Sequence, residues 1–138
     1  MKNTKDLQNE LSNAHNIDQY LKNNEDYIID QSLAQYFCDV LNQKSISKQD
    51  VIKRSDLNEI YAYQIISGKR VPSRNKLICL CIGAKFTVEE TNETLQVGGF
   101  SPLFPKIKRD SIIFFGIKNS YSVWQINEEL YSHKLQTL

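Results

Sequence analysis

The residues that could take part in recognition chemistry are concentrated between Ser47 and Arg74. The stretch from 45 to 76 contains seven Lys or Arg against three Asp or Glu, although the whole chain has a net charge of only +1. A basic segment in a nearly neutral chain is typical of a surface that binds a polyanion, but a solvated helix surface has the same composition. The secondary structure that carries these cations is therefore needed to distinguish the two interpretations.

The cysteines are the other residues with distinctive chemistry. Cys79 and Cys81 are separated only by Leu80 within a helical pattern, which directs their thiols about 200° apart. They cannot share a tetrahedral metal ion while helical, and only two histidines could complete a shell. We expect these cysteines and Cys38 to pack as small apolar residues, with no metal site.

Motifs of enzymes and of cofactor-binding proteins are absent. The chain has no glycine-rich phosphate loop, no nucleophile elbow and no His/Glu metal spacing. We therefore predict no enzymatic activity, no catalytic residues and no cofactor, and no small-molecule ligand is evident. The longest apolar run, Leu77 to Ala84, is far shorter than the roughly 20 residues that cross a bilayer, so we expect no membrane association and a cytoplasmic location.

Apolar residues recur at helical spacing, and strand patterns are nearly missing, so we predict an all-α fold. Residues 31–43 form an amphipathic pattern after Asp30 or Ser32 as N-cap. Three further helices are predicted to start at 48, 88 and 123. Each follows a hydroxyl residue with a polar residue three positions later, namely Ser47 with Asp50, Thr87 with Glu90, and Ser122 with Gln125.

An offset of 35 residues aligns the segment from Leu77 to Leu95 with the segment from Ile112 to Leu130. A solenoid-type repeat would produce such a pattern, and so would two helical hairpins of similar size that need similar caps and core positions. Since two copies are too few for a stable stack, we favour two similar hairpins.

The basic segment has the pattern of a helix-turn-helix. A helix over 48–54 is followed by the turn Ser55-Asp56-Leu57, and a second helix over 59–67 follows Asn58 as N-cap. Asp56 is one of the few residues other than glycine that accept left-handed backbone geometry. Gly68 then ends the second helix before a basic loop.

This arrangement resembles the XRE family of Cro/repressor-type helix-turn-helix proteins over residues 31–97. The resemblance rests on Ser47, Val51, the Ser55-Asp56-Leu57 turn, and the segment Gly68-Lys69-Arg70-Val71-Pro72-Ser73, which is similar to the G-K-R-x-P-S signature of the family. It implies a five-helix lambda-repressor-like core, a bacterial or phage transcriptional regulator, and double-stranded DNA as partner.

The resemblance also implies which residues contact DNA, because the second helix of such a motif lies in the major groove. The residues that would face base edges are Asn58, Glu59, Ile60, Tyr63 and Gln64, and those that would meet phosphates are Lys48, Lys69, Arg70 and Arg74. The groove helix has no Lys or Arg, so a different function is also considered. In that alternative the helix-turn-helix is an adaptor that binds a protein through Ile60, Tyr61 and Tyr63.

The remaining segments are predicted to be helical as well. Residues 1–30 form an acidic N-terminal arm, and residues 98–138 form a connector and a C-terminal helical hairpin. The apolar residues of the hairpin must bury against something. Either the hairpin packs on the core, or it forms the seam of a two-fold homodimer.

Overall fold

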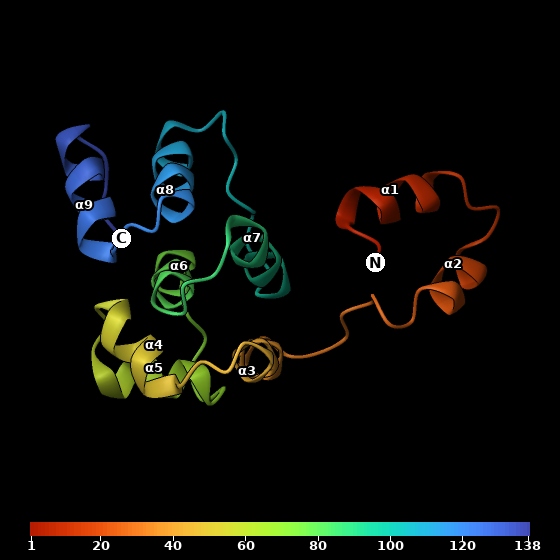
Figure 1. Cartoon of the computed structure of the whole chain (residues 1–138), viewed down its shortest axis with the longest axis horizontal. Helices are drawn as coiled ribbons and strands as arrows, with labels where there is room; N and C mark the ends of the chain where they lie inside the picture. Colours follow the sequence, from red (N-terminus) through yellow and green to blue (C-terminus); the bar gives the residue numbers. More distant parts are fainter. The chain divides into compact units, whose positions relative to one another are not determined.

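The computed structural model describes residues 1–138 and confirms the all-helical prediction, with nine helices and no strands (Figure 1). The chain divides into two compact units, Met1–Asp30 and Gln31–Leu138. None of the helices combines the length and the apolar character that a membrane span requires. The helices are α1 (Thr4–Ser12), α2 (Ile17–Asn23), α3 (Leu33–Gln43), α4 (Lys48–Ser55), α5 (Glu59–Ile66), α6 (Arg74–Gly83), α7 (Val88–Val97), α8 (Lys108–Lys118) and α9 (Val123–Ser132).

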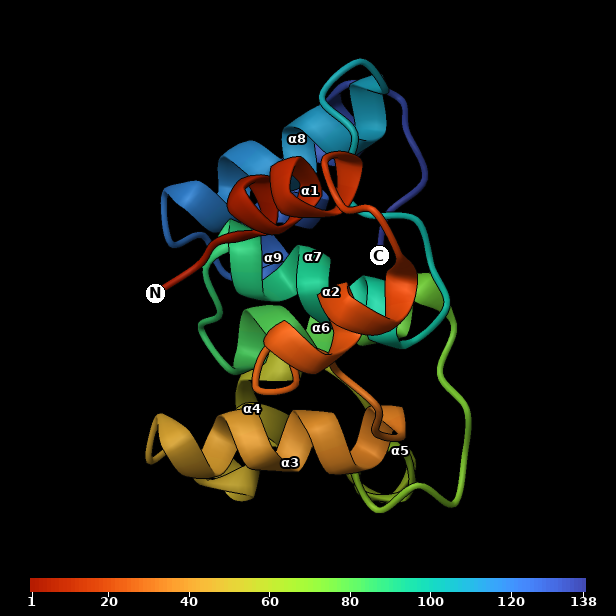
Figure 2. The same ribbon diagram turned by 90° about the vertical axis from the view of Figure 1, so that its right-hand side faces the viewer.

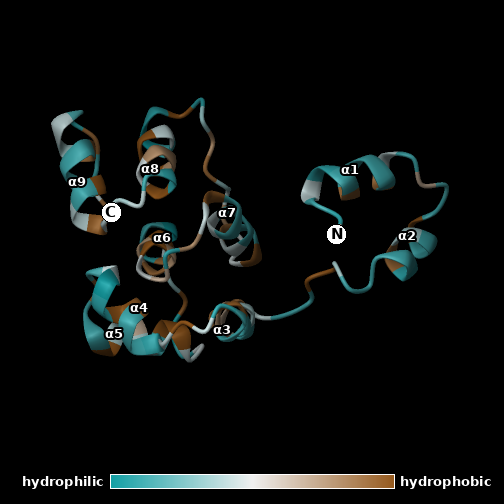
Figure 3. Cartoon of the chain, viewed as in Figure 1, coloured by the Kyte–Doolittle hydropathy of each residue, from teal (hydrophilic) through white to brown (hydrophobic).

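The first unit consists of two short capped helices. Asn3 caps α1 in a reciprocal capping box with Asp6, and Asn16 caps α2. The Lys2 ammonium joins the two ends of the unit by donating to the Glu10 carboxylate at 3.0 Å and to Asn24 Oδ1 at 2.8 Å. Both helices are mostly hydrophilic (Figure 3).

The second unit is organised around α6. Figures 1 and 2 show α6 and α7 between the α8–α9 hairpin on one side and α3, α4 and α5 on the other. Every residue of α6 from Leu77 to Gly83 is buried, which explains the continuous apolar run that the sequence carries there. A helix that is apolar all round must be covered on all sides.

Because α6 is central, it contributes to two separate core clusters. Leu80 and Cys81 belong to the cluster formed with α3, α4 and α5, whereas Ile78 and Cys79 belong to the cluster formed with α7, α8 and α9. The two neighbouring cysteines therefore point into opposite halves of the core. Burial raises the pKa of the Cys81 thiol to about 12 and that of Cys79 to about 11.

The predicted helix starts at 48, 88 and 123 are confirmed. Thr87 and Ser122 form reciprocal capping boxes, whereas Ser47 caps α4 by accepting from the Asp50 amide without the return bond. The helix predicted over 31–43 begins at Leu33 instead, because Ser32 is its N-cap.

The two segments related by the 35-residue offset have the same local geometry. Lys85 and Ser120 have left-handed backbones, with φ of 57° and 59°, and the residue after each closes the helix end with a bond from Phe86 N to Cys81 O or from Tyr121 N to Gly116 O. The turn between α3 and α4 repeats this geometry at Ser45, with φ of 56°. The recurrence therefore includes one type of turn between helices, which the expectation of two similar hairpins did not specify.

The C-terminal hairpin packs on the rest of the second unit. Ile113, Ile126 and Leu130 are fully buried in the cluster shared with α6 and α7. A buried ion pair adds to this contact, since Arg74 at the start of α6 donates two bonds to Asp110 in the first turn of α8. The outward face of the hairpin leaves three aromatic side chains exposed, Phe115, Trp124 and Tyr131.

Candidate nucleic-acid interface

The α4–α5 pair is held by a tight turn built from its own residues. Asp56 adopts the left-handed backbone that the sequence predicts, with φ of 62° and ψ of 20°. The buried Ser55 hydroxyl donates to Ile52 O at 2.7 Å and accepts from Leu57 N at 3.3 Å. Asn58 then caps α5 by accepting from the Tyr61 amide at 3.1 Å. These bonds fix where α5 begins relative to α4.

The contact between α4 and α5 is apolar, and Val51, Ile52, Ala62 and Ile65 are all buried in it. On the other side, α4 lies directly against α6, because Gly83 approaches so closely that a Cβ there would stand 2.3 Å from the Val51 carbonyl oxygen. The α4–α5 pair is therefore held against α6 through α4, while one face of α5 stays exposed. The helix bounds differ from the predicted 48–54 and 59–67 by one residue each, because Ser55 remains helical and Ser67 is the C-cap of α5.

The uncovered face of α5 carries most of the residues that were predicted to contact bases. Ile60 is 70% exposed and Tyr63 38% exposed, and Glu59 is exposed at the N-terminus of the helix. Asn58 is exposed too, but its side-chain oxygen is engaged in capping α5. Tyr61, which was named only for the adaptor alternative, is partly buried and packs against the core cluster of α3 to α6.

The loop after α5 folds back on the helix. Gly68 has φ of 85°, and the amides of Lys69 and Arg70 both bond to Gln64 O, at 2.9 and 3.2 Å. The Arg70 guanidinium donates its Nε to Gln64 Oε1 at 3.0 Å and lies over the Tyr61 ring, 5.3 Å from its centroid. Gln64 is thus tied to a cation, and its side-chain oxygen already accepts one of the two bonds that an amide oxygen can accept.

Three of the four predicted phosphate-binding cations are exposed. Lys48 is the first residue of α4, and Lys69 and Arg70 follow α5. None of them takes part in an ion pair with a carboxylate of the chain. Arg70 uses only its Nε within the chain, so its terminal nitrogens are available to a phosphate.

The fourth cation, Arg74, is placed differently. Its guanidinium is turned into the unit, where it binds the Asp110 carboxylate at 2.9 and 3.0 Å and donates to the Ser101 and Pro102 carbonyls. The assignment of Arg74 to phosphate contacts is therefore corrected. Asp110 lies 36 residues further along the chain, so only the tertiary structure could identify this partner.

A hollow of about 600 Å³ lies between α4 and α5, and no pattern in the sequence predicted it. Lys53 is the one cation in its lining, whereas Asp56 and Glu59 are acidic. Val71, in the loop beyond α5, is 85% exposed and was also not singled out. The hollow is therefore mildly acidic and partly apolar, and none of the predicted phosphate-binding cations lines it.

Comparisons of the chain with protein-family models, with curated proteins and with solved structures found no match.

Proposed function

We propose that the protein binds double-stranded DNA in a sequence-specific manner and regulates transcription. In this proposal α3 to α7 form the five-helix core of an XRE-type domain, and α4 and α5 are its helix-turn-helix. The observation that carries the proposal is the combination of an uncovered outer face on α5 with unpaired cations at Lys48, Lys69 and Arg70. A helix that is anchored on one side and flanked by cations has the arrangement that places recognition residues in a major groove.

The roles of the side chains differ in this proposal. Lys48, Lys69 and Arg70 bind phosphates, which orients the protein without reading sequence. Glu59 accepts from cytosine N4, and Ile60 contacts a thymine methyl group. Gln64 pairs with adenine through its side-chain amide, while its oxygen also accepts the bond from Arg70 at 3.0 Å.

The salt dependence of binding tests the electrostatic part. At about 0.9 per neutralised phosphate, three contacts give a log-log slope of about 2.7, so raising salt fourfold from 50 to 200 mM weakens binding about 40-fold. Arg70→Ala lowers the slope to about 1.8 on every duplex, which corresponds to about a 12-fold loss over the same range. Lys134→Asn, which changes a lysine beyond α9, is the control and leaves the slope unchanged. Fluorescence anisotropy with random-sequence duplexes measures all three proteins.

Sequence reading needs a second measurement on duplexes selected from a random pool. Ile60→Ala and Gln64→Ala each change the base preferred at one position, whereas Arg70→Ala leaves the selected sequence unaltered. Because Gln64 also holds Arg70, its substitution additionally weakens binding to all sequences. If all three variants select the same sequence, α5 is not the helix that reads the bases.

A homodimer would give two such surfaces, and the outward face of the α8–α9 hairpin is the surface that we propose for it. Trp124 and Tyr131 lie seven residues apart on one side of α9 and are 67% and 77% exposed. Sedimentation equilibrium of the wild type and of Trp124→Ala tests this assembly. A dimer that Trp124→Ala dissociates supports it, and a wild-type monomer at all concentrations refutes it.

The second candidate function, binding of a protein partner, is favoured by one specific observation. Ile60 and Tyr63 are exposed on α5, and Tyr63 lines a hollow that has two carboxylates and one lysine, which suits an apolar side chain better than a phosphate. The same salt titration separates the two functions, since no measurable binding to DNA, or a flat response to salt, favours the adaptor.

A further inference from the structure

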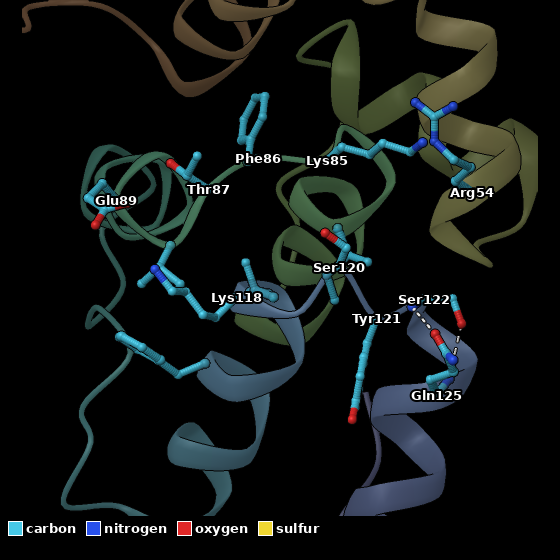
Figure 4. Close-up of a pocket in the computed structure, with 14 residues that line it drawn as sticks. Arg54, Lys85, Phe86, Thr87, Glu89, Lys118, Ser120, Tyr121, Ser122 and Gln125 are labelled. Atoms are coloured by element: carbon cyan, nitrogen blue, oxygen red, sulfur yellow. Dashed lines mark hydrogen bonds between the residues drawn. The ribbon is translucent and has the colours of Figure 1, made fainter.

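A cavity of about 640 Å³ lies in the second unit, between the α6–α7 turn and the α8–α9 turn (Figure 4). These are two of the structurally equivalent turns described above, and the cavity lies where they face each other. Its volume falls in the range of pockets that hold small organic ligands. It does not include the exposed residues of α5, so it is separate from the proposed DNA-binding surface.

One part of the cavity wall is apolar. Ile82 at the end of α6 contributes to it, and Phe114 and Ile117 contribute from α8. Phe114 and Ile117 are only half-buried, so the protein leaves apolar surface uncovered inside a concave site. Covering that surface with an apolar ligand would remove it from water and favour binding.

Some of the polar groups of the lining are already engaged within the protein. Thr87 and Ser122 accept bonds from the amides of Glu90 and Gln125, and Gln125 Oε1 accepts from Ser122 N. Figure 4 shows the last two of these bonds at the edge of the cavity. The Ser120 and Tyr121 hydroxyls remain for a ligand, together with the charged groups.

The charges of the lining favour an anion. The lining contains three cations, Arg54, Lys85 and Lys118, but only one carboxylate, Glu89. No carboxylate lies within ion-pair distance of any of the three cations. Cations grouped at a partly enclosed apolar wall attract an anion more strongly than isolated surface lysines do.

Arg54 and Lys85 lie close together. Arg54 Nε donates to the Gly83 carbonyl at 2.7 Å, which holds the guanidinium two residues from Lys85 along the chain. In Figure 4 the Lys85 side chain extends toward Arg54. Since only Nε is engaged, the terminal nitrogens of Arg54 remain for a carboxylate, which a guanidinium binds well.

We propose that this cavity binds a small amphipathic carboxylate. Its carboxylate lies between Arg54 and Lys85, and its apolar body covers Ile82, Phe114 and Ile117. The proposal does not depend on DNA binding, because it uses neither the residues nor the charges of the α5 face.

Isothermal titration of the full-length protein with sodium decanoate, below its micelle concentration, tests the proposal. We expect saturable binding of one decanoate per chain, and at least tenfold weaker binding of uncharged 1-decanol and of acetate, which lack the carboxylate and the apolar body, respectively. Amide shifts in ¹⁵N-labelled protein should be concentrated on residues 82–88 and 114–122.

Two lysines with the same backbone geometry provide a matched pair of variants. Lys85 lines the cavity and Lys134 does not, yet both are left-handed, with φ of 57° and 60°, a conformation that asparagine accepts. Lys85→Asn should weaken decanoate binding at least tenfold, whereas Lys134→Asn should not change it. Thermal unfolding shows that both variants are folded before they are compared.

Several results would overturn the proposal. These are an absence of saturable binding, equal losses in the two asparagine variants, equal affinity for 1-decanol, or amide shifts that are confined to Trp124 and Tyr131 on the outer surface. Tighter binding of an acidic amphipathic peptide at residues 82–88 and 114–122 would also overturn it, since the occupant would then be a polypeptide.

Discussion

Replacing Arg74 with alanine should destabilise the second unit strongly. The Asp110 carboxylate is 5% exposed and is held by two bonds from Arg74, at 2.9 and 3.0 Å, and by one from the Phe104 amide at 3.0 Å. After the substitution only the Phe104 amide still bonds to the carboxylate, and Arg109 is left as a nearby cation that makes no hydrogen bond to it. Breaking a buried pair from one side costs about 3–5 kcal/mol.

The loss should be visible in both chemical and thermal unfolding. Of a typical total of about 5–15 kcal/mol, a loss near 4 kcal/mol is a large fraction. It corresponds to a decrease in melting temperature of roughly 16 °C at about 4 °C per kcal/mol. Urea titrations monitored by circular dichroism give the free energy. Arg70→Ala, which changes an exposed arginine, is the control and should cost less than about 1 kcal/mol.

A double substitution isolates the buried charge as the cause. Arg74→Met with Asp110→Leu replaces the pair by apolar side chains and should recover much of the stability that Arg74→Ala loses. The reasoning is refuted if Arg74→Ala is as stable as Arg70→Ala and loses DNA affinity instead. That result would mean that Arg74 meets phosphate, as the sequence alone suggested.

Three other predictions concern the core and the caps. Gly83→Ala should destabilise the protein by about 3 kcal/mol or more, because the new Cβ would meet the Val51 carbonyl. Gly98→Ala is the control and should cost clearly less, because the nearest neighbours there are side-chain ends. Equal losses in urea unfolding would contradict the close contact between α4 and α6. In the native protein at neutral pH, only the half-buried Cys38 should react rapidly with a thiol reagent, whereas all three cysteines should react in urea. Burial raises the pKa values of Cys79 and Cys81 to about 11 and 12 and so keeps both thiols protonated. Rapid labelling of two thiols in the native protein would contradict this prediction. Burial tends to raise the pKa of Glu90, but bonds from Lys44 and the Thr87 amide lower it below its usual 4.5, so the stability that Glu90 contributes is present above pH 4.5 and is lost as the pH falls through the lowered pKa. Glu90→Gln should remove this part of the acid sensitivity, and an unchanged pH profile of the unfolding free energy would refute its origin.

Local features of the fold could be predicted from the sequence because neighbouring residues decide them. Ser47, Thr87 and Ser122 begin their helices where predicted, since an N-cap needs only a hydroxyl and an amide three residues away. Asp56 likewise determines its own left-handed turn. Similarly, the spacing of Cys79 and Cys81 was enough to show that their thiols diverge.

Features that depend on distant partners could not be predicted in this way. Arg74 is basic and follows the predicted DNA-binding loop, so its sequence position suggested phosphate, but its partner Asp110 comes from another helix. The Gln64–Arg70 bond depends on how the loop after Gly68 folds back. The cavity beside Lys85 exists only because two turns, 35 residues apart in sequence, face each other.

The central claim is that DNA contacts the outer face of α5, and mapping of amide shifts tests it most directly. The ¹⁵N-labelled full-length protein is titrated with a duplex selected from a random pool. The account predicts that the largest shifts fall on residues 58–64 and on Lys69 and Arg70. Shifts that avoid α5, or no shifts at all at 50 mM salt, would contradict it.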